Sequence, residues 1–131
     1  MRILVAGHGD LPEALVSSAR MIGGELPDIS SLGLFPGEGP QDFRDRMLQA
    51  LSDSPADLIL TDLAGGTPDN VANLLARTGQ LGSARWVVAG ASLPLLLEFA
   101  LSIEPLEGLD PALLIAETGA TLRHPTPGSP A

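Results

Sequence analysis

The chain has 131 residues, a formal net charge of −9 and no cysteine, and 44% of its residues are hydrophobic but only 3% aromatic. This length suits one compact domain with a core of Leu, Ile, Val and Ala, and the missing cysteines exclude disulfides and thiolate metal sites. All seven basic residues are arginines scattered along an acidic chain. This argues against nucleic acid or an anionic membrane as a partner, whereas a basic protein partner, or acidity that serves solubility alone, would fit.

Strands and helices alternate along the sequence. Short apolar runs predict buried strands at residues 3–6, 29–35, 58–63 and 86–89. Apolar residues at helical spacing, bounded by proline and glycine, predict helices at residues 11–21, 40–51, 67–78, 93–102 and 110–117. Alternating elements of this length favour right-handed crossovers between parallel strands. We therefore expect an α/β fold, with an open parallel sheet of four strands and helices on both faces.

The first predicted strand leads directly into a histidine between two glycines, Gly7-His8-Gly9. A helix follows at once, with Asp10 as its predicted N-cap and Pro12 in its first turn. His8 would then lie on a strand-to-helix turn, at the edge where open α/β sheets bind their ligands.

The third predicted strand runs into Asp62 and then Gly65-Gly66-Thr67. We predict Thr67 as the N-cap of the next helix, with Pro68 in its first position. If the first and third strands are neighbours, the chain winds away from them in opposite directions and leaves a crevice between their ends. His8 and Asp62 would face each other across it, and Ser92 would follow the fourth strand on a third loop.

Such a histidine–aspartate pair supports a specific chemistry. A neutral imidazole is nucleophilic through its unprotonated nitrogen, and a carboxylate that accepts the proton of the other nitrogen fixes the tautomer. A glycine-lined helix start, as Gly65, Gly66 and Thr67 would form, suits an incoming phosphoryl group. These loops therefore indicate a phosphohistidine site on which a second protein delivers the phosphoryl group.

Each candidate residue also has an alternative that is only structural. His8 could be an ordinary turn residue, Asp62 a cap or loop hydrogen-bonder, Gly65-Gly66 a tight turn and Ser92 an N-cap. A nucleotide-binding domain is a further alternative, but Pro12 stands where a dinucleotide fingerprint needs a third glycine, and the chain has no lysine for a Walker motif. No metal-ligand spacing is present, so we predict no metal and no cofactor.

Several segments together resemble the enzyme IIA domain of the mannose family of the sugar phosphotransferase system, over essentially the whole chain. These segments are Val5-Ala6-Gly7-His8-Gly9, Phe35-Pro36-Gly37-Glu38, the run from Thr61 to Pro68, the run from Val88 to Leu96, and Glu117-Thr118-Gly119. Each segment alone is weak, whereas their order along the predicted loops is specific.

The resemblance implies a phosphocarrier with a role for each matched position. His8 would carry the phosphoryl group on Nε2, and Asp62 would accept the Nδ1 proton. Thr67 would hold the phosphoryl group through its hydroxyl and backbone N–H, beside Gly65 and Gly66. Ser92 stands where the family often has asparagine, so a contact from that loop stays open.

The resemblance also implies partners. The donor would be phosphorylated HPr, and the dimer would be a homodimer in which a strand at residues 120–124 crosses to the partner's sheet as a fifth, antiparallel strand. Since the sequence carries no IIB domain, the acceptor would be a separate IIB protein. Alternatively, the chain would be a regulatory module whose phosphorylation state controls binding to a signalling partner.

The ends of the chain complete these expectations. We expect a single domain over residues 1–124 and a flexible tail, rich in Pro, Gly and Ser, over residues 125–131. No apolar run approaches the ~20 residues of a membrane span, and the first strand begins too early for a signal peptide. The expected location is therefore the cytoplasm, without membrane insertion.

Overall fold

One parallel sheet forms the centre of the protein, whose computed structural model describes residues 1–130. Its strands are β1 (Ile3–His8), β2 (Ile29–Leu34), β3 (Leu58–Thr61) and β4 (Trp86–Ala89). They lie in the order β2-β1-β3-β4, and every neighbouring pair is parallel. The predicted four-stranded sheet is confirmed, and so is the neighbouring position of the first and third strands.

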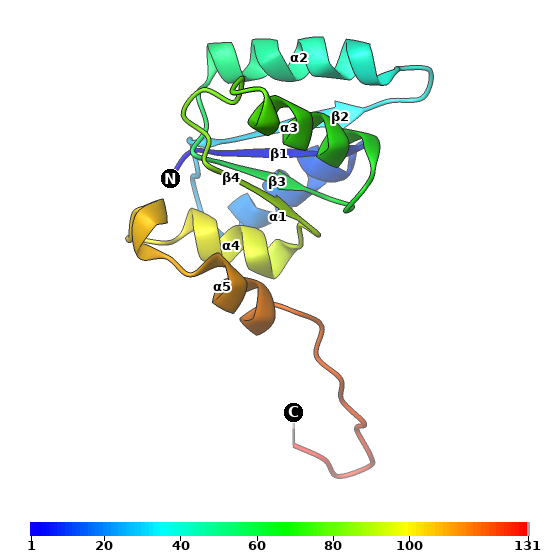
Figure 1. Ribbon diagram of the computed structural model, residues 1–131. Helices are drawn as coiled ribbons and strands as arrows, with labels where there is room; N and C mark the ends of the chain where they lie inside the picture. Colours follow the sequence, from blue (N-terminus) through cyan, green and yellow to red (C-terminus); the bar gives the residue numbers. More distant parts are fainter. Residues whose placement is uncertain (131) are drawn as a thin grey trace.

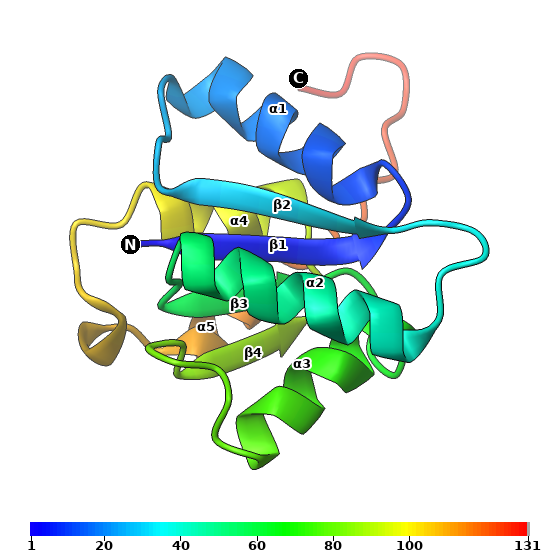
Figure 2. The same cartoon turned by 90° about the horizontal axis from the view of Figure 1, so that it is seen from above.

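Helices cover both faces of the sheet, as predicted. They are α1 (Leu11–Gly23), α2 (Pro40–Asp53), α3 (Thr67–Arg77), α4 (Leu93–Ala100) and α5 (Pro111–Glu117), with a short 3-10 helix η1 (Leu106–Gly108). Figures 1 and 2 show α2 and α3 on one face, and α1, α4 and α5 on the other. The molecule therefore has three layers, with the sheet in the middle.

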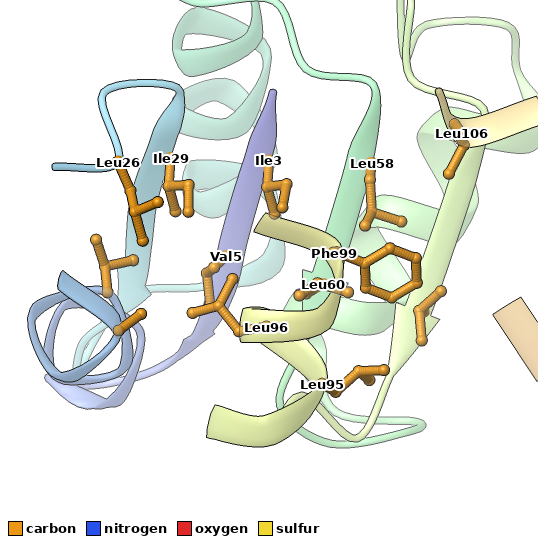
Figure 3. Close-up of a cluster of buried hydrophobic side chains, with 13 residues drawn as sticks. Ile3, Val5, Leu26, Ile29, Leu58, Leu60, Leu95, Leu96, Phe99 and Leu106 are labelled. Carbon is orange, nitrogen blue, oxygen red and sulfur yellow. The ribbon is translucent and has the colours of Figure 1, made fainter. Parts of the chain in front are cut away.

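The two central strands are buried on both sides, because successive residues of a strand point to opposite faces. One core layer, drawn in Figure 3, includes Ile3, Val5, Leu58, Leu60, Leu96 and Phe99. The layer on the other face includes Leu4, Ala6, Phe43, Met47, Ile59 and Leu75. Packing on both faces makes β1 and β3 a firm support for the loops that follow them.

Several element boundaries differ from the sequence prediction. Strand β1 extends two residues beyond the predicted end, so His8 is its last residue and pairs with Leu34 of β2. Strand β3 ends at Thr61, two residues before the predicted end. The next residue, Asp62, accepts the backbone N–H of His8 in β1 with its side chain. Asp10 occupies the N-cap position of α1, but its side chain accepts no capping hydrogen bond.

Smaller shifts affect the other ends. Helix α1 continues to Gly23, two residues beyond the predicted end, and Gly24 is its C-cap, with a φ of 79° in the left-handed region that favours glycine. Strand β2 ends one residue early, helix α2 extends two residues into the predicted loop, and α4 ends at Ala100 rather than 102. Such shifts are usual at element ends, where helices fray and single residues change assignment.

Beyond α5, residues 119–130 contain no helix or strand, and in Figure 1 this segment leads away from the body of the molecule. Residues 120–124 therefore form no strand within the single chain, and their pairing with a partner's sheet stays a prediction. Residue 131, the last of the predicted tail 125–131, lies outside the described residues. No helix within residues 1–130 combines the length and the hydropathy that crossing a bilayer requires.

Candidate functional site

His8 and Asp62 meet at the carboxyl edge of the two central strands. His8 ends β1, and Asp62 directly follows β3. Nδ1 of His8 lies 2.9 Å from Oδ2 and 3.2 Å from Oδ1 of Asp62. The same Oδ2 accepts the backbone N–H of His8 at 2.9 Å. The juxtaposition expected from the strand order is present, because β2 and β3 flank β1 on opposite sides.

Exposure differs sharply between the two side chains. The carboxylate of Asp62 is 8% exposed, whereas the imidazole of His8 is 47% exposed. A neutral imidazole that donates Nδ1–H to this carboxylate leaves the lone pair on Nε2. No hydrogen bond within residues 1–130 engages Nε2. The pair thus combines a fixed tautomer with an accessible nucleophilic nitrogen.

Two glycines make room for this pair. A Cβ atom at Gly7 would lie 2.7 Å from Cγ of Asp62. A Cβ atom at Gly66 would lie 2.9 Å from Cε1 of His8 and 3.5 Å from its Nε2. Any larger residue at either position would displace the carboxylate or the ring. Gly66 therefore forms a wall of the site: its backbone lies beside Cε1 and Nε2 of His8 and leaves no room for a side chain.

The loop between Asp62 and α3 is a tight turn. The N–H of Gly66 donates to the carbonyl of Leu63 at 3.1 Å, and Gly65 has a φ of 80°. The N–H of Gly65 donates to Oδ2 of Asp69 at 3.1 Å. The N–H groups of both glycines are thus already bonded within the loop. Gly65 and Gly66 would help to bind an anion because they have no side chain that would keep it at a distance.

Thr67 is not the N-cap of α3, and this prediction is wrong. The N-cap is Gly66, with extended backbone angles, and Thr67 is the first helical residue. The reason is that the turn closes at Gly66, one residue earlier than the sequence pattern indicates. The backbone N–H of Thr67 belongs to the first turn, where no helix carbonyl pairs with it. The side-chain hydrogen bonds of this loop within residues 1–130 join Thr61 and Gly65 to Asp69 and Asn70 and do not engage the Thr67 hydroxyl.

Ser92 has the structural role that the sequence also allowed. It is the N-cap of α4, and its Oγ accepts the backbone N–H of Leu95 at 3.3 Å. Its loop is tied to the site edge, because the N–H of Ala91 donates to the carbonyl of Thr61 at 2.8 Å. No hydrogen bond joins Ser92 to His8 or Asp62 in the part of the chain that the structure describes.

A shallow, mainly apolar depression lies beside His8. Its lining consists of His8, Gly9, Leu34, Phe35, Pro36, Gly37 and Glu38. Arg46 of α2 fixes this loop, since its Nη1 donates to both Glu38 oxygens at 2.7 Å and to the carbonyl of Gly33 at 2.9 Å. Sequence reasoning missed Arg46, because a spacing of eight residues between Glu38 and Arg46 carries no local pattern.

Asp69, in the first turn of α3, was missed as well. The available signal was an acidic residue directly after Thr67-Pro68, a position that favours negative charge at a helix start. Within residues 1–130, no group of three His, Cys, Asp or Glu side chains is arranged to hold a metal ion.

Comparison with known proteins identifies the family of this chain. The family model EIIA-man, described as "PTS system fructose IIA component", matches residues 2–109. A fructose-specific EIIA component of Bacillus subtilis is 40% identical over 100 residues, which cover 73% of this chain and 66% of that protein. A sorbose-specific EIIA component of Lacticaseibacillus casei is 35% identical over 104 residues, which cover 78% of this chain and 73% of that protein.

Longer relatives and solved structures give the same result. The match to the mannose-specific EIIAB component of Escherichia coli, 27% identical, covers 89% of this chain but 36% of that protein. The mannose/sorbose-specific IIA subunit of Enterococcus faecalis superposes with a TM-score of 0.78 at 29% identity, covering 95% of this chain and 96% of that one. The chain therefore belongs to the mannose-type EIIA family of phosphotransferase system components.

Proposed function

We propose that this chain is a cytoplasmic phosphocarrier of the phosphoenolpyruvate-dependent sugar phosphotransferase system. It accepts a phosphoryl group on Nε2 of His8 from phosphorylated HPr and passes it to a IIB protein. The observation that carries this proposal is the 2.9 Å contact between Nδ1 of His8 and Oδ2 of Asp62, which leaves Nε2 without a partner. Family membership supplies the phosphotransferase system as the context.

The transfer exchanges one phosphorus–nitrogen bond for another. The lone pair on Nε2 of His8 attacks the phosphorus of the donor's phosphohistidine, and the bond between that phosphorus and the donor nitrogen breaks, leaving its electron pair on the donor imidazole. His8 keeps its Nδ1–H bonded to Asp62, and this carboxylate stabilises the positive charge that develops on the ring. A nucleophilic side chain of the acceptor protein then repeats the attack on the phosphorus held by His8.

The phosphoryl oxygens would lie at the start of α3. Thr67 offers its backbone N–H and its free hydroxyl there, and the positive end of the helix dipole adds to the attraction. Gly65 and Gly66 contribute a surface without side chains, which allows the phosphoryl group to come close. Ser92 keeps its hydroxyl in the α4 cap and receives no role in this step.

The depression beside His8 suits a protein donor rather than a small molecule. It is open and mainly apolar, and Phe35 presents a half-exposed ring on it. The ion pair between Glu38 and Arg46 keeps this loop in place. A partner that covers Phe35 would bring its own phosphohistidine next to Nε2 of His8.

We also propose that the chain works as a homodimer. Helix α5 has no buried residue. Exposed apolar side chains gather along the end of the chain from α4 onward: Leu101, Ile103, Leu113, Ile115 and Leu122. A second copy would cover them, and residues 120–124 could then add their antiparallel strand to its sheet.

Light scattering tests the dimer. It should give twice the chain mass for residues 1–131 and a single chain mass for a chain truncated after Gly119. A monomeric full chain would contradict the dimer.

The phosphocarrier role is tested by labelling. The protein is incubated with phosphorylated HPr, and mass spectrometry locates the phosphoryl group. We expect label on His8 in the wild type and none in His8→Ala, while His124→Ala, which removes the other histidine of the chain, labels normally. Label that persists in His8→Ala would overturn the assignment.

A second experiment separates the carrier from the signalling alternative. Rapid discharge of the phosphoryl group to an added IIB protein supports the carrier role. A phosphoryl group that stays on His8 and changes capture of a regulatory protein supports the signalling alternative.

A further inference from the structure

Asp69 is a buried carboxylate that the phosphoryl transfer described above does not use. It is 8% exposed, and Thr61 is the other buried polar side chain within residues 1–130. Burying a carboxylate is unfavourable unless hydrogen bonds and opposite charge replace the lost water. The partners of Asp69 therefore show which part of the molecule its charge holds.

Both partners belong to the loop that surrounds His8. Oδ1 of Asp69 accepts the hydroxyl of Thr61 at 2.7 Å, and Oδ2 accepts the N–H of Gly65 at 3.1 Å. Thr61 directly precedes Asp62, and Gly65 directly precedes Gly66. One carboxylate thus bonds the residue before the loop at residues 62–66 and the fourth residue within it. That loop carries Asp62, whose Oδ2 lies 2.9 Å from Nδ1 of His8, and Gly66, where an added Cβ atom would lie 2.9 Å from Cε1.

These bonds are anchored in helix α3. Asp69 lies in the first helical turn, where the positive end of the helix dipole stabilises a carboxylate. The neighbouring Asn70 adds a bond from its Nδ2 to the carbonyl of Gly65 at 3.0 Å. The turn is therefore fixed from the helix at the amide and at the carbonyl of Gly65.

We propose that Asp69 is a positioning residue for phosphoryl transfer. By holding Thr61 and Gly65, it keeps Asp62 and Gly66 in place around His8, so that Nε2 faces the incoming phosphoryl group. This inference rests on the proposed phosphocarrier function. We expect the two hydrogen bonds of Asp69 to matter more for the transfer rate than its negative charge. An asparagine at this position would have no charge, but its oxygen can accept the Gly65 N–H and its NH₂ can donate to the Thr61 hydroxyl.

The experiment compares Asp69→Ala with Asp69→Asn. Asp69→Ala removes both bonds, and we expect the rate of His8 labelling by phosphorylated HPr to fall about tenfold with the KM for HPr unchanged, because small misplacements of reacting groups are costly. Asp69→Asn should restore the rate to within about twofold of wild type, since it can remake both bonds. Asn73→Ala is the matched control: it removes a bond of 2.9 Å to the Asp69 backbone carbonyl on the same helix, without touching the loop.

A second readout separates positioning from general stability. In the unphosphorylated protein, ¹⁵N NMR of the His8 ring should show the Nδ1–H tautomer in wild type, Asp69→Asn and Asn73→Ala, and a mixed tautomer in folded Asp69→Ala. If Asp69→Ala does not fold, Thr61→Val takes its place, because it removes one of the two bonds while keeping the side-chain volume. For Thr61→Val we expect a smaller loss of rate and the same change of tautomer.

The outcomes are distinguishable. If the wild type takes no label, the phosphocarrier function fails, whereas the tautomer comparison still tests Asp69. If the wild type is labelled but the folded Asp69→Ala, or Thr61→Val in its place, keeps both the wild-type rate and the wild-type tautomer, the positioning role is overturned. A loss of rate that Asp69→Asn does not restore would also overturn it in the form stated.

Discussion

Two pairs of side chains join β1 to β3 at opposite ends of the same two strands. At the amino edge, Arg2 meets Asp57, and at the carboxyl edge, His8 meets Asp62. The shortest nitrogen–oxygen distance is 2.9 Å in both pairs. In each pair the aspartate lies directly outside β3, on one side or the other. Distance alone therefore does not distinguish a structural pair from a candidate site.

The surroundings of the two pairs differ. Asp57 is 33% exposed at its side chain and Asp62 only 8%. The guanidinium of Arg2 carries a permanent charge and has no lone pair to attack an electrophile. The imidazole of His8, in contrast, contacts the carboxylate through Nδ1 and keeps Nε2 free. Reactivity at the carboxyl edge thus comes from a buried carboxylate, a titratable ring and the glycines that surround them.

The largest expected effect comes from Asp62→Asn. The amide oxygen can still accept the backbone N–H of His8, but the amide NH₂ would then face Nδ1 and favour the tautomer with the proton on Nε2. Because that proton blocks the nucleophilic lone pair, we expect the rate of His8 labelling to fall by at least about 100-fold. Quench-flow labelling with phosphorylated HPr measures this rate.

Asp57→Asn is the matched control at the other edge. It removes a carboxylate from an equally short contact with Arg2, the residue directly before β1, and it should leave the labelling rate unchanged. If Asp57→Asn and Asp62→Asn slow labelling equally, the difference between the two edges has no functional meaning.

A smaller effect is expected from Gly66→Ala. The new methyl group would lie 2.9 Å from Cε1 of His8, so the ring must turn away from its position on Asp62. We expect labelling to slow about tenfold while the fold is retained. The comparison variant is Gly65→Ala, whose methyl group meets no atom within 4 Å but whose φ is 80°. This variant should lose about 1 kcal/mol of unfolding free energy and keep more of the labelling rate; the opposite ranking of the two rates would contradict the role of Gly66 as a wall.

The smallest expected effect is the pH dependence of the Arg2–Asp57 pair. The hydrogen bond from Arg2 is the main cause that lowers the pKa of Asp57 below the ordinary value of 3.8, against a smaller opposing effect of burial. A lowered pKa means that the pair stabilises the fold fully above that ordinary value, and that this stabilisation is lost as the pH falls through the folded-state pKa. Since the pair is exposed, Asp57→Asn should cost less than about 1 kcal/mol at pH 7. Urea unfolding should show this difference shrinking at low pH; a difference that grows with acid would contradict the assignment.

The sequence predicted the frame of the site because that frame depends on regular patterns. Four apolar runs separated by helical spacing predict the parallel sheet. The approach of His8 to Asp62 was expected on the condition that the first and third strands are neighbours, and the order β2-β1-β3-β4 meets this condition. Family membership, predicted from five segments taken together and in order along the chain, is also confirmed.

What the sequence did not predict depends on tertiary contacts or on a single turn. Residue preference favours Thr67 as the N-cap of α3, whereas the N-cap is Gly66, because preference alone does not show where the preceding turn closes. Asp69 was overlooked, because only the folded chain brings it to Thr61. The hold of Arg46 on the loop at Glu38 likewise joins residues without a common local pattern. These contacts shape the site, although no motif marks them.

The most direct test of the whole account is to determine which atom carries the phosphoryl group after incubation with phosphorylated HPr. Phosphorus and nitrogen NMR of protein labelled with ¹⁵N in its histidines identifies the bonded nitrogen. We predict phosphorus on Nε2 of His8, with Nδ1 still protonated and bonded to Asp62. Phosphorus on Nδ1 of His8, or on any other residue, would contradict the account.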